Sequence, residues 1–289
     1  MTDLHFPREA ALHLVVTALD EDLGGGVDVT TDATIPPEQV STAQLVVRAD
    51  GVLAGIPVVA MVFDEVARRL GAEPLRVETL RADGDALARG DVAAIVHGST
   101  QVTLVGERTM LNLVCRLSGI ATHTRAWAER LEGTGATVLD TRKTTPGLRA
   151  LEKYAVRAGG GTNKRMGLFD VAMIKDNHKL AAGSLSAAYA AVLAKYPDVP
   201  VQVEVTTREE ALEAVGVGAR FLLCDNMSVD VLRETVDAVR ATGEAVELEA
   251  TGGLTLDVAR DYALTGVDYL SVGGLTHSSP ILDLALDLV

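Results

Sequence analysis

The sequence predicts an α/β protein in two parts: a mixed N-terminal region, then a parallel β-sheet that could close into a small barrel. The 289-residue chain is 48% hydrophobic but only 3% aromatic, a composition typical of buried parallel strands rich in Ala, Val and Leu. Helical and strand-like patterns mix over the first ~110 residues. From Ala136 the pattern becomes strand, loop and helix, repeated. A chain of this length suits one large domain or two linked ones.

In the N-terminal region, apolar residues at helical spacing predict a first helix over residues 7–22, with Pro7 in its first turn. Further helices are expected over residues 56–70, 101–117 and 120–131. Strand-like runs occur at residues 43–48, 75–79 and 92–97, and the turn signals DGV, ADGDAL and RGD separate them.

The C-terminal region is expected to contain strands at residues 137–139, 171–174, 201–205, 221–224, 245–249 and 269–272. Helices are expected between them at residues 149–157, 185–195, 208–215, 230–241 and 256–264. Strands that alternate with helices indicate βαβ units and a parallel sheet. Six units are too few for an eight-stranded barrel but could close a smaller one.

Chemically useful groups follow each of these strands. In chain order they are Asp140, Thr141, Arg142 and Lys143; Lys175, Asp176 and Asn177; Glu204; Asp225 and Asn226; Thr251, Gly252 and Gly253; and Gly273 and Gly274. The carboxyl ends of parallel strands meet at one edge, where barrel enzymes hold their active sites. The two Gly-Gly loops come last, where exposed backbone N–H groups commonly bind phosphate.

Positive charge is concentrated between Asp140 and Lys179, in a chain whose formal net charge is −14. This stretch holds nine Lys and Arg residues against four acids. A ligand with several negative charges is the simplest reason to gather like charges, so a small polyanionic substrate is expected. The acidity of the whole chain argues against nucleic acid as a partner.

The residue types leave some roles open. Lys175 could be an ordinary strand-end lysine, a carboxylate clamp or a Schiff-base nucleophile. Glu204 and Asp225 could form simple salt bridges, bind a divalent cation or stabilise a developing sugar cation. His277 could assist a phosphate or cap a helix.

Other classes of protein are disfavoured. Cys115 and Cys224 lie in apolar segments without a CxxC partner and are expected to be buried thiols. No zinc-ligand spacing, GxSxG or Walker A motif is present. A secretion signal is not evident, and the longest apolar run, residues 52–63, is too short to span a bilayer, so a cytoplasmic protein is expected.

Several motifs together resemble the quinolinate phosphoribosyltransferases, also called nicotinate-nucleotide pyrophosphorylases (carboxylating). They are EDLGGGVDVTTDATIP, ERTMLNLVCRLSGIAT, LDTRKTTPGLRALEKYAV, GGG, IKDNH, VEV, LLCDN, TGGL and YLSVGGLTHS. The resemblance implies an N-terminal α/β sandwich over residues 1–115 and an incomplete, TIM-like α/β barrel of six or seven parallel strands over residues 116–279. A C-terminal helix at about residues 281–288, within a final segment 280–289, would return to the first domain.

The implied reaction joins quinolinate to phosphoribosyl pyrophosphate and gives nicotinate mononucleotide, pyrophosphate and CO₂, with Mg²⁺ as cofactor. The implied catalytic residues are Lys143, Lys175, Glu204 and Asp225, and the two acids would also serve Mg²⁺. The implied substrate-binding residues include these four together with Arg108, Thr141, Arg142, Lys164, Arg165, Thr251, Gly252, Gly253, Val272, Gly273, Gly274 and His277. The family also implies a homodimer or a dimer-based hexamer, in which Arg108 reaches the neighbouring site.

Two positions depart from the family pattern. Asn163-Lys164-Arg165 stands where the family commonly has Asn-His-Arg, and Thr251-Gly252-Gly253 where it commonly has Ser-Gly-Gly. A lysine in place of a histidine is expected to keep anion binding but to remove a pH dependence. It also leaves a related pyridine carboxylate open as the substrate. A Schiff-base barrel lyase using Lys175 and a non-catalytic anion-binding protein are the rival classes.

Overall fold

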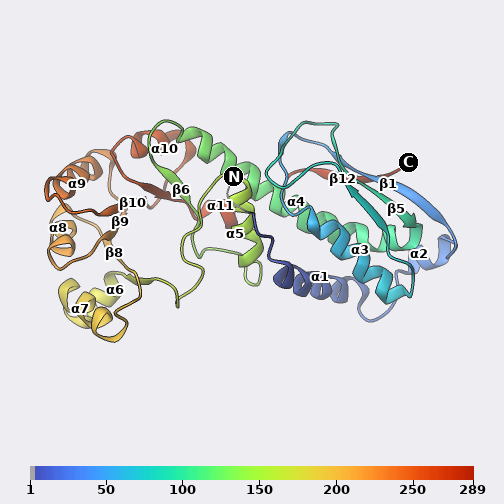
Figure 1. The fold of residues 1–289 in the computed structure, drawn as a ribbon, viewed down its shortest axis with the longest axis horizontal. Coiled ribbons are helices and arrows are strands. Elements are labelled where there is room, and N and C mark those ends of the chain that lie inside the picture. Colours follow the sequence, from blue (N-terminus) through green and yellow to red (C-terminus); the bar gives the residue numbers. More distant parts are fainter. Residues whose placement is uncertain (1–3) are drawn as a thin grey trace. The chain divides into compact units, whose positions relative to one another are not determined.

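The structure, a computed structural model, describes residues 4–289 and divides into two compact units (Figure 1). Unit 1 consists of residues 4–125, Thr144–Gly160 and Leu275–Val289. Unit 2 consists of Ala126–Lys143 and Gly161–Gly274. The units therefore divide after Arg125, ten residues beyond the boundary expected at residue 115, and unit 1 also takes up a segment from the middle of the chain.

Unit 1 is built on an antiparallel sheet with the strand order β12-β1-β5-β3. Its strands are β1 (Val40–Val47), β3 (Arg76–Thr79), β5 (Val92–Ser99) and β12 (Leu284–Leu288), and a small separate pair consists of β2 (Gly51–Val52) and β4 (Ala86–Leu87). The helices are α1 (Arg8–Leu23), α2 (Val29–Thr34), α3 (Pro57–Leu70), α5 (Arg149–Ala158) and most of α4 (Thr100–Arg130). Helices α1, α3 and α4 lie on one side of the sheet (Figure 1), which gives the expected sandwich of helices and strands.

The C-terminal segment corrects one expectation from the resemblance. Residues 284–288 form strand β12, which pairs antiparallel with β1, and not a helix. Leu284 is buried against the unit 1 core, and pairing satisfies the backbone N–H and C=O groups that β1 would otherwise expose as a sheet edge. The segment LALDL is also too short for a stable helix without packing on both sides.

Helix α4 is a single helix of 31 residues, where the sequence indicated two. The two expected helices, 101–117 and 120–131, left residues 118–119 between them, and glycine weakens a helix interior. In the structure Gly119 is a packing position: a Cβ there would overlap the carbonyl oxygen of Pro280. The glycine thus admits the chain just before β12, and the surrounding contacts maintain the helix.

Unit 2 contains a six-stranded parallel sheet with the order β6-β11-β10-β9-β8-β7. Its strands are β6 (Thr137–Leu139), β7 (Ala172–Ile174), β8 (Val201–Val205), β9 (Phe221–Asp225), β10 (Glu247–Thr251) and β11 (Tyr269–Ser271). The connecting helices are α6 (Asp176–Ala182), α7 (Leu185–Lys195), α8 (Arg208–Gly216), α9 (Val229–Ala241) and α10 (Leu256–Ala263). The short α11 (Gly274–His277) follows β11 in the chain, and its residues from Leu275 onward belong to unit 1. A bridge between Leu139 and Thr162 extends the sheet beyond β6.

These strands confirm the expected parallel βαβ arrangement and the incomplete barrel. Strands β6 and β8 have the expected bounds, and β10 lies two residues further along the chain than expected. Helix α6 was not expected, because its polar start, Asp176-Asn177-His178, has the composition of a loop. Across residues 4–289, no helix is both long and apolar enough to cross a membrane.

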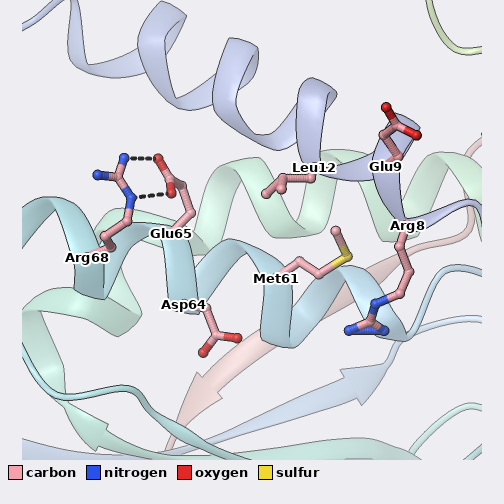
Figure 2. A pocket seen from close by; sticks show the side chains of 7 residues that line it. All are labelled: Arg8, Glu9, Leu12, Met61, Asp64, Glu65 and Arg68. Carbon is pink, nitrogen blue, oxygen red and sulfur yellow. Dashed lines mark hydrogen bonds and ion pairs between the residues drawn. The ribbon is translucent and has the colours of Figure 1, made fainter.

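A groove of about 500 Å³ lies between α1 and α3 of unit 1 (Figure 2). It is lined by Arg8, Glu9, Leu12, Met61, Asp64, Glu65 and Arg68. The Glu65 carboxylate bonds to Arg68 at 2.7 Å and to Arg69 at 2.9 Å, and these guanidinium groups lower the pKa of Glu65 to about 2. Glu65 and Arg68, which Figure 2 joins by dashed lines, are thus paired with each other.

Candidate active site

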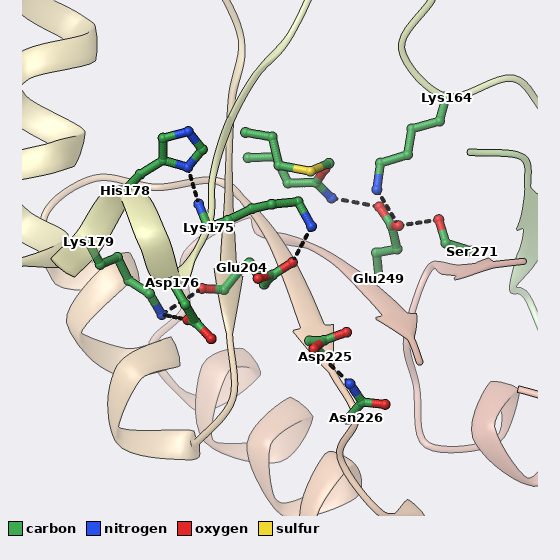
Figure 3. Close-up of polar contacts among 12 residues, drawn as sticks. Lys164, Lys175, Asp176, His178, Lys179, Glu204, Asp225, Asn226, Glu249 and Ser271 are labelled. Carbon is green, nitrogen blue, oxygen red and sulfur yellow. Dashed lines mark hydrogen bonds and ion pairs between the residues drawn. The ribbon is translucent and has the colours of Figure 1, made fainter. Parts of the chain in front are cut away.

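Two groups of polar side chains lie along the strands of unit 2 (Figure 3). We call Lys175, Glu204, Asp225 and Thr251 the strand-end group, since each lies within one residue of the carboxyl end of a strand. We call Lys164, Gln202, Glu249 and Ser271 the interior cluster. Side chains two apart on a strand share a face, so β8 supplies Gln202 and Glu204, and β10 supplies Glu249 and Thr251. The sequence predicted the first group and missed most of the second.

In the strand-end group, Lys175 donates to Glu204 with an Nζ–Oε2 distance of 2.7 Å. The Lys175 side chain is 47% exposed and that of Glu204 is 10% exposed. The chain after Lys175 turns at once into α6, whose Lys179 bonds to the Glu204 carbonyl oxygen at 3.1 Å and to Glu210 at 3.0 Å. Helix α6 therefore fixes the end of β8 and holds the Lys175–Glu204 pair in place.

The loops after β9 and β10 are in close contact. Asn226 has a φ of 55°, unusual for a residue other than glycine, and donates to Asp225 at 2.8 Å. Its backbone N–H bonds to the Thr251 carbonyl oxygen at 2.9 Å. Gly252 has a φ of 96°, and a Cβ there would overlap the Asn226 side chain. Only glycine fits this position, which explains the first glycine of the Thr251-Gly252-Gly253 motif.

Two guanidinium groups of unit 2, Arg142 after β6 and Arg165 before β7, form no ion pair in residues 4–289. The buried Nε of Arg142 has no hydrogen-bond partner in the part of the chain that the structure describes. Arg165 donates to the Val171 carbonyl oxygen at 3.0 Å. Burial and the positive charge of Arg142 lower the pKa of Arg165. Two adjacent cations with an unused buried donor are the arrangement expected for an anion site.

The interior cluster centres on Glu249, which is fully buried. Its carboxylate accepts from the Lys164 ammonium, from the Ser271 hydroxyl and from Gln202 Nε2, the last at 2.6 Å. A cavity of about 330 Å³ lies beside this cluster, lined in part by residues 162–165, 170 and 171 and by the first residues of β9, β10 and β11. Lys164, predicted as a substrate contact, is thus placed against a protein carboxylate.

The remaining predicted residues divide between the units. Thr141, Lys143, Val272, Gly273 and Gly274 belong to unit 2, and the Lys143 backbone N–H bonds to the Thr141 hydroxyl at 3.0 Å. Arg108, exposed on α4, and His277, exposed on α11, belong to unit 1. His277 Nδ1 lies 2.6 Å from the Ser278 hydroxyl.

One buried ion pair in unit 1 was not expected from the sequence. Arg116 of α4 bonds to the fully buried Glu152 of α5 at 2.9 Å, and also to the carbonyl oxygens of Thr276 and Ser279. Glu152 also accepts from the backbone and hydroxyl of Thr145, which follows the Lys143 loop. The available signal was a lone arginine in the apolar run LVCRLSG, but nothing local connects it to a carboxylate 36 residues away.

Together, these observations describe a barrel-like α/β protein with a candidate site for an anion among the side chains of its parallel strands. Comparison with known proteins identifies the family. The model of the quinolinate phosphoribosyl transferase N-terminal domain matches residues 28–118, and that of the C-terminal domain matches residues 120–287. The chain belongs to the quinolinate phosphoribosyl transferase family.

Curated relatives match along most of their length. The chain is 46% identical to the nicotinate-nucleotide pyrophosphorylase [carboxylating] of Mycobacterium leprae over 288 residues, 100% of both chains. It is 43% identical to the probable enzyme of that name from Bacillus subtilis, over 93% of this chain and 90% of the relative. Among solved structures, NadC from Streptococcus pyogenes superposes with a TM-score of 0.88 at 35% identity and covers 95% of each chain.

Proposed function

We propose that this protein transfers the phosphoribosyl group of phosphoribosyl pyrophosphate to quinolinate, giving nicotinate mononucleotide, pyrophosphate and CO₂. The observation that carries the proposal is the pair of guanidinium groups, Arg142 and Arg165, which lack carboxylate partners in the described chain. Quinolinate carries two adjacent carboxylates, and forked guanidinium groups bind carboxylates in a bidentate manner. Family membership supports the same reaction.

Lys175 and Glu204 would exchange partners when substrates bind. The Lys175 side chain is 47% exposed while that of Glu204 is 10% exposed, so a substrate carboxylate can reach the Lys175 ammonium from solvent. The Glu204 carboxylate would then face the ribose and, with Asp225, the positive charge that develops at C1′. Lys143, which is exposed, would contact the phosphoribosyl pyrophosphate.

The bonds change in two stages. The ring nitrogen of quinolinate forms a bond to C1′ as the C1′–O bond to pyrophosphate breaks. The pyridinium ring then accepts the electron pair of the bond to the 2-carboxylate, CO₂ leaves, and a proton is taken up at that carbon. The protein's part is to position the two substrates and to stabilise charge. Backbone N–H groups of Gly252, Gly253, Gly273 and Gly274, beside Thr251 and Val272, would bind the 5′-phosphate.

The carboxylates present fit the expected Mg²⁺. Glu204 and Asp225 lie on neighbouring strands, and oxygen donors are the ligands that Mg²⁺ prefers. In residues 4–289 no three His, Cys, Asp or Glu side chains form a metal-binding group, so Mg²⁺ would have at most two protein carboxylates and keep water or pyrophosphate oxygens. When bound, the ion would neutralise charge on the leaving pyrophosphate.

The surroundings of Lys175 disfavour the Schiff-base alternative. A nucleophilic lysine must be neutral, which proteins achieve by burial or by neighbouring cations. Lys175 is instead half-exposed and paired with a carboxylate. The roles proposed for Arg108 of a partner subunit and for His277, together with the dimeric assembly and the cytoplasmic location, remain predictions.

The test is an assay of the purified protein with phosphoribosyl pyrophosphate, MgCl₂ and quinolinate labelled in its 2-carboxylate. We expect labelled CO₂ and nicotinate mononucleotide in equal amounts, no product when EDTA removes the metal, and little product with nicotinate. A clear preference for nicotinate, or mononucleotide without CO₂, would contradict the proposal. Borohydride reduction with a carbonyl substrate serves as a control and should leave no adduct on Lys175.

A further inference from the structure

Lys164 is held in place by both its side chain and its backbone. Its side chain is 9% exposed, and the ammonium donates to the fully buried Glu249. Its backbone N–H bonds to Asp140 Oδ1 at 2.8 Å, and the neighbouring Asn163 amide bonds to Asp140 Oδ2 at 2.7 Å. Asp140 is itself fully buried, directly after β6. These bonds fix the segment that contains Lys164 to two different strands.

The Lys164 ammonium is therefore costly to redirect toward a ligand. Moving it would leave the buried Glu249 carboxylate with the Gln202 amide and the Ser271 hydroxyl as its remaining partners in residues 4–289. Removing one partner of a buried ion pair is far more costly than breaking an exposed pair. Burial lowers the pKa of Lys164, and the Glu249 carboxylate opposes this shift, so the two groups stabilise each other's charge. The Lys175–Glu204 pair, by contrast, has a half-exposed lysine.

The bonds that hold Lys164 also affect the position of the next residue, Arg165. Arg165 follows directly, and its guanidinium is placed by bonds to the Val171 carbonyl oxygen at 3.0 Å and the Met173 sulfur at 3.5 Å. Since Lys164 and Glu249 compensate each other's charge, the ammonium of Lys164 adds no unpaired positive charge for a dianionic substrate. Arg142 and Arg165 form no ion pair in residues 4–289 and can supply that charge.

We propose that Lys164 is a positioning residue, which uses Glu249 to hold the segment that presents Arg165, and that it does not contact the substrate carboxylates. The inference rests on the proposed function, because the substrate it concerns is quinolinate. Where the family commonly has a histidine, the lysine at this position would therefore hold the segment through Glu249 and would not bind the substrate.

A double-mutant cycle tests this inference. Lys164→Met and Glu249→Gln each leave the other group buried without its charged partner, and we expect each to raise the KM for quinolinate on the order of 10- to 100-fold by misplacing Arg165. The double variant Lys164→Met/Glu249→Gln removes both charges and keeps an amide for Gln202 and Ser271. We expect it to return the KM to within about threefold of the wild type.

Two results would overturn the inference by showing that Lys164 binds the substrate directly. A double variant as impaired as Lys164→Met would show that the substrate itself needs the ammonium. Tighter quinolinate binding by Glu249→Gln than by the wild type would show that a released lysine binds the ligand. An unchanged KM in Lys164→Met would also overturn it, because a positioning role requires an effect.

A control separates positioning from general loss of stability. Glu65→Gln removes a buried carboxylate of unit 1 that is paired with Arg68 and Arg69. It should lower the Tm and leave the KM for quinolinate unchanged. Wild-type turnover, measured first, decides the proposed function by itself. The Tm of the wild type, the two single variants and the double variant, measured without substrate, shows separately whether Lys164 and Glu249 are coupled. Additive changes in Tm would count against the inference.

Discussion

The strand-end group and the interior cluster of unit 2 contain the same kinds of side chain but differ in how these are satisfied. Each includes a lysine paired with a glutamate. In the interior cluster the pair is buried and the glutamate accepts from two further donors. In the strand-end group the lysine is 47% exposed. Arg142, after β6, has a buried Nε donor without a partner in the described residues.

This difference shows which charges are available for chemistry. A buried ion pair with further hydrogen-bond donors is costly to break and holds the segments that carry it in fixed positions. In the Lys175–Glu204 pair the glutamate is buried but the lysine is half-exposed, so the ammonium is within reach of a ligand. Residue type does not reveal the distinction, because each pair joins a lysine to a glutamate on a strand: Glu204 is the fourth of five residues in β8, and Glu249 is the third of five in β10.

The largest expected effect comes from the strand-end carboxylates. Glu204→Gln and Asp225→Asn should each lower kcat on the order of 10²- to 10³-fold, because both remove charge that would face the developing cation at C1′. The Tm should change little, since neither carboxylate centres a buried network. Steady-state kinetics and thermal unfolding measure the two effects. Glu209→Gln on the exposed surface of α8 is the matched control, and a large Tm loss in Glu204→Gln would remove the contrast between the two groups.

A smaller effect is expected from the contact between the loops. In Gly252→Ala the alanine cannot adopt the φ of 96° without strain, and its Cβ would overlap the Asn226 side chain. We expect the free energy of unfolding to fall by about 2–3 kcal/mol and the KM for phosphoribosyl pyrophosphate to rise. Gly243→Ala has a φ of 75° but open space around it, and should cost only about 1 kcal/mol. Equal losses from chemical denaturation of the two variants would mean that the Asn226 contact has no role.

The smallest expected effect tests whether the interior is closed to solvent. Cys224 lies on β9, and burial together with the Glu249 charge raises the pKa of its thiol to about 12. Only the thiolate reacts with alkylating reagents, so Cys224 should stay protonated and unlabelled at pH 8. Cys115 is buried as well, and burial raises its pKa too. Mass spectrometry should show no native labelling and two labels in denaturant. Rapid native labelling of Cys224 would show that the interior opens.

Elements with a strong local pattern could be predicted, and those that depend on a distant partner could not. The alternation of apolar strands and amphipathic helices placed β6, β8 and α7 at the observed bounds. The C-terminal strand β12 was missed because its conformation is decided by pairing with β1, more than 200 residues earlier. The single helix α4 was missed because a glycine that weakens an isolated helix is here required for close packing.

The sequence by itself determined the α/β class, the order of the parallel strands along the chain, the chemical groups at their carboxyl ends and the resemblance to a family. These follow from short-range periodicity and motif spacing, which the chain carries locally. Only the tertiary structure decided which charges are paired with each other. Lys164 with Glu249, and Arg116 with Glu152, are far apart in the sequence, and a charge's role depends on its burial and its partners.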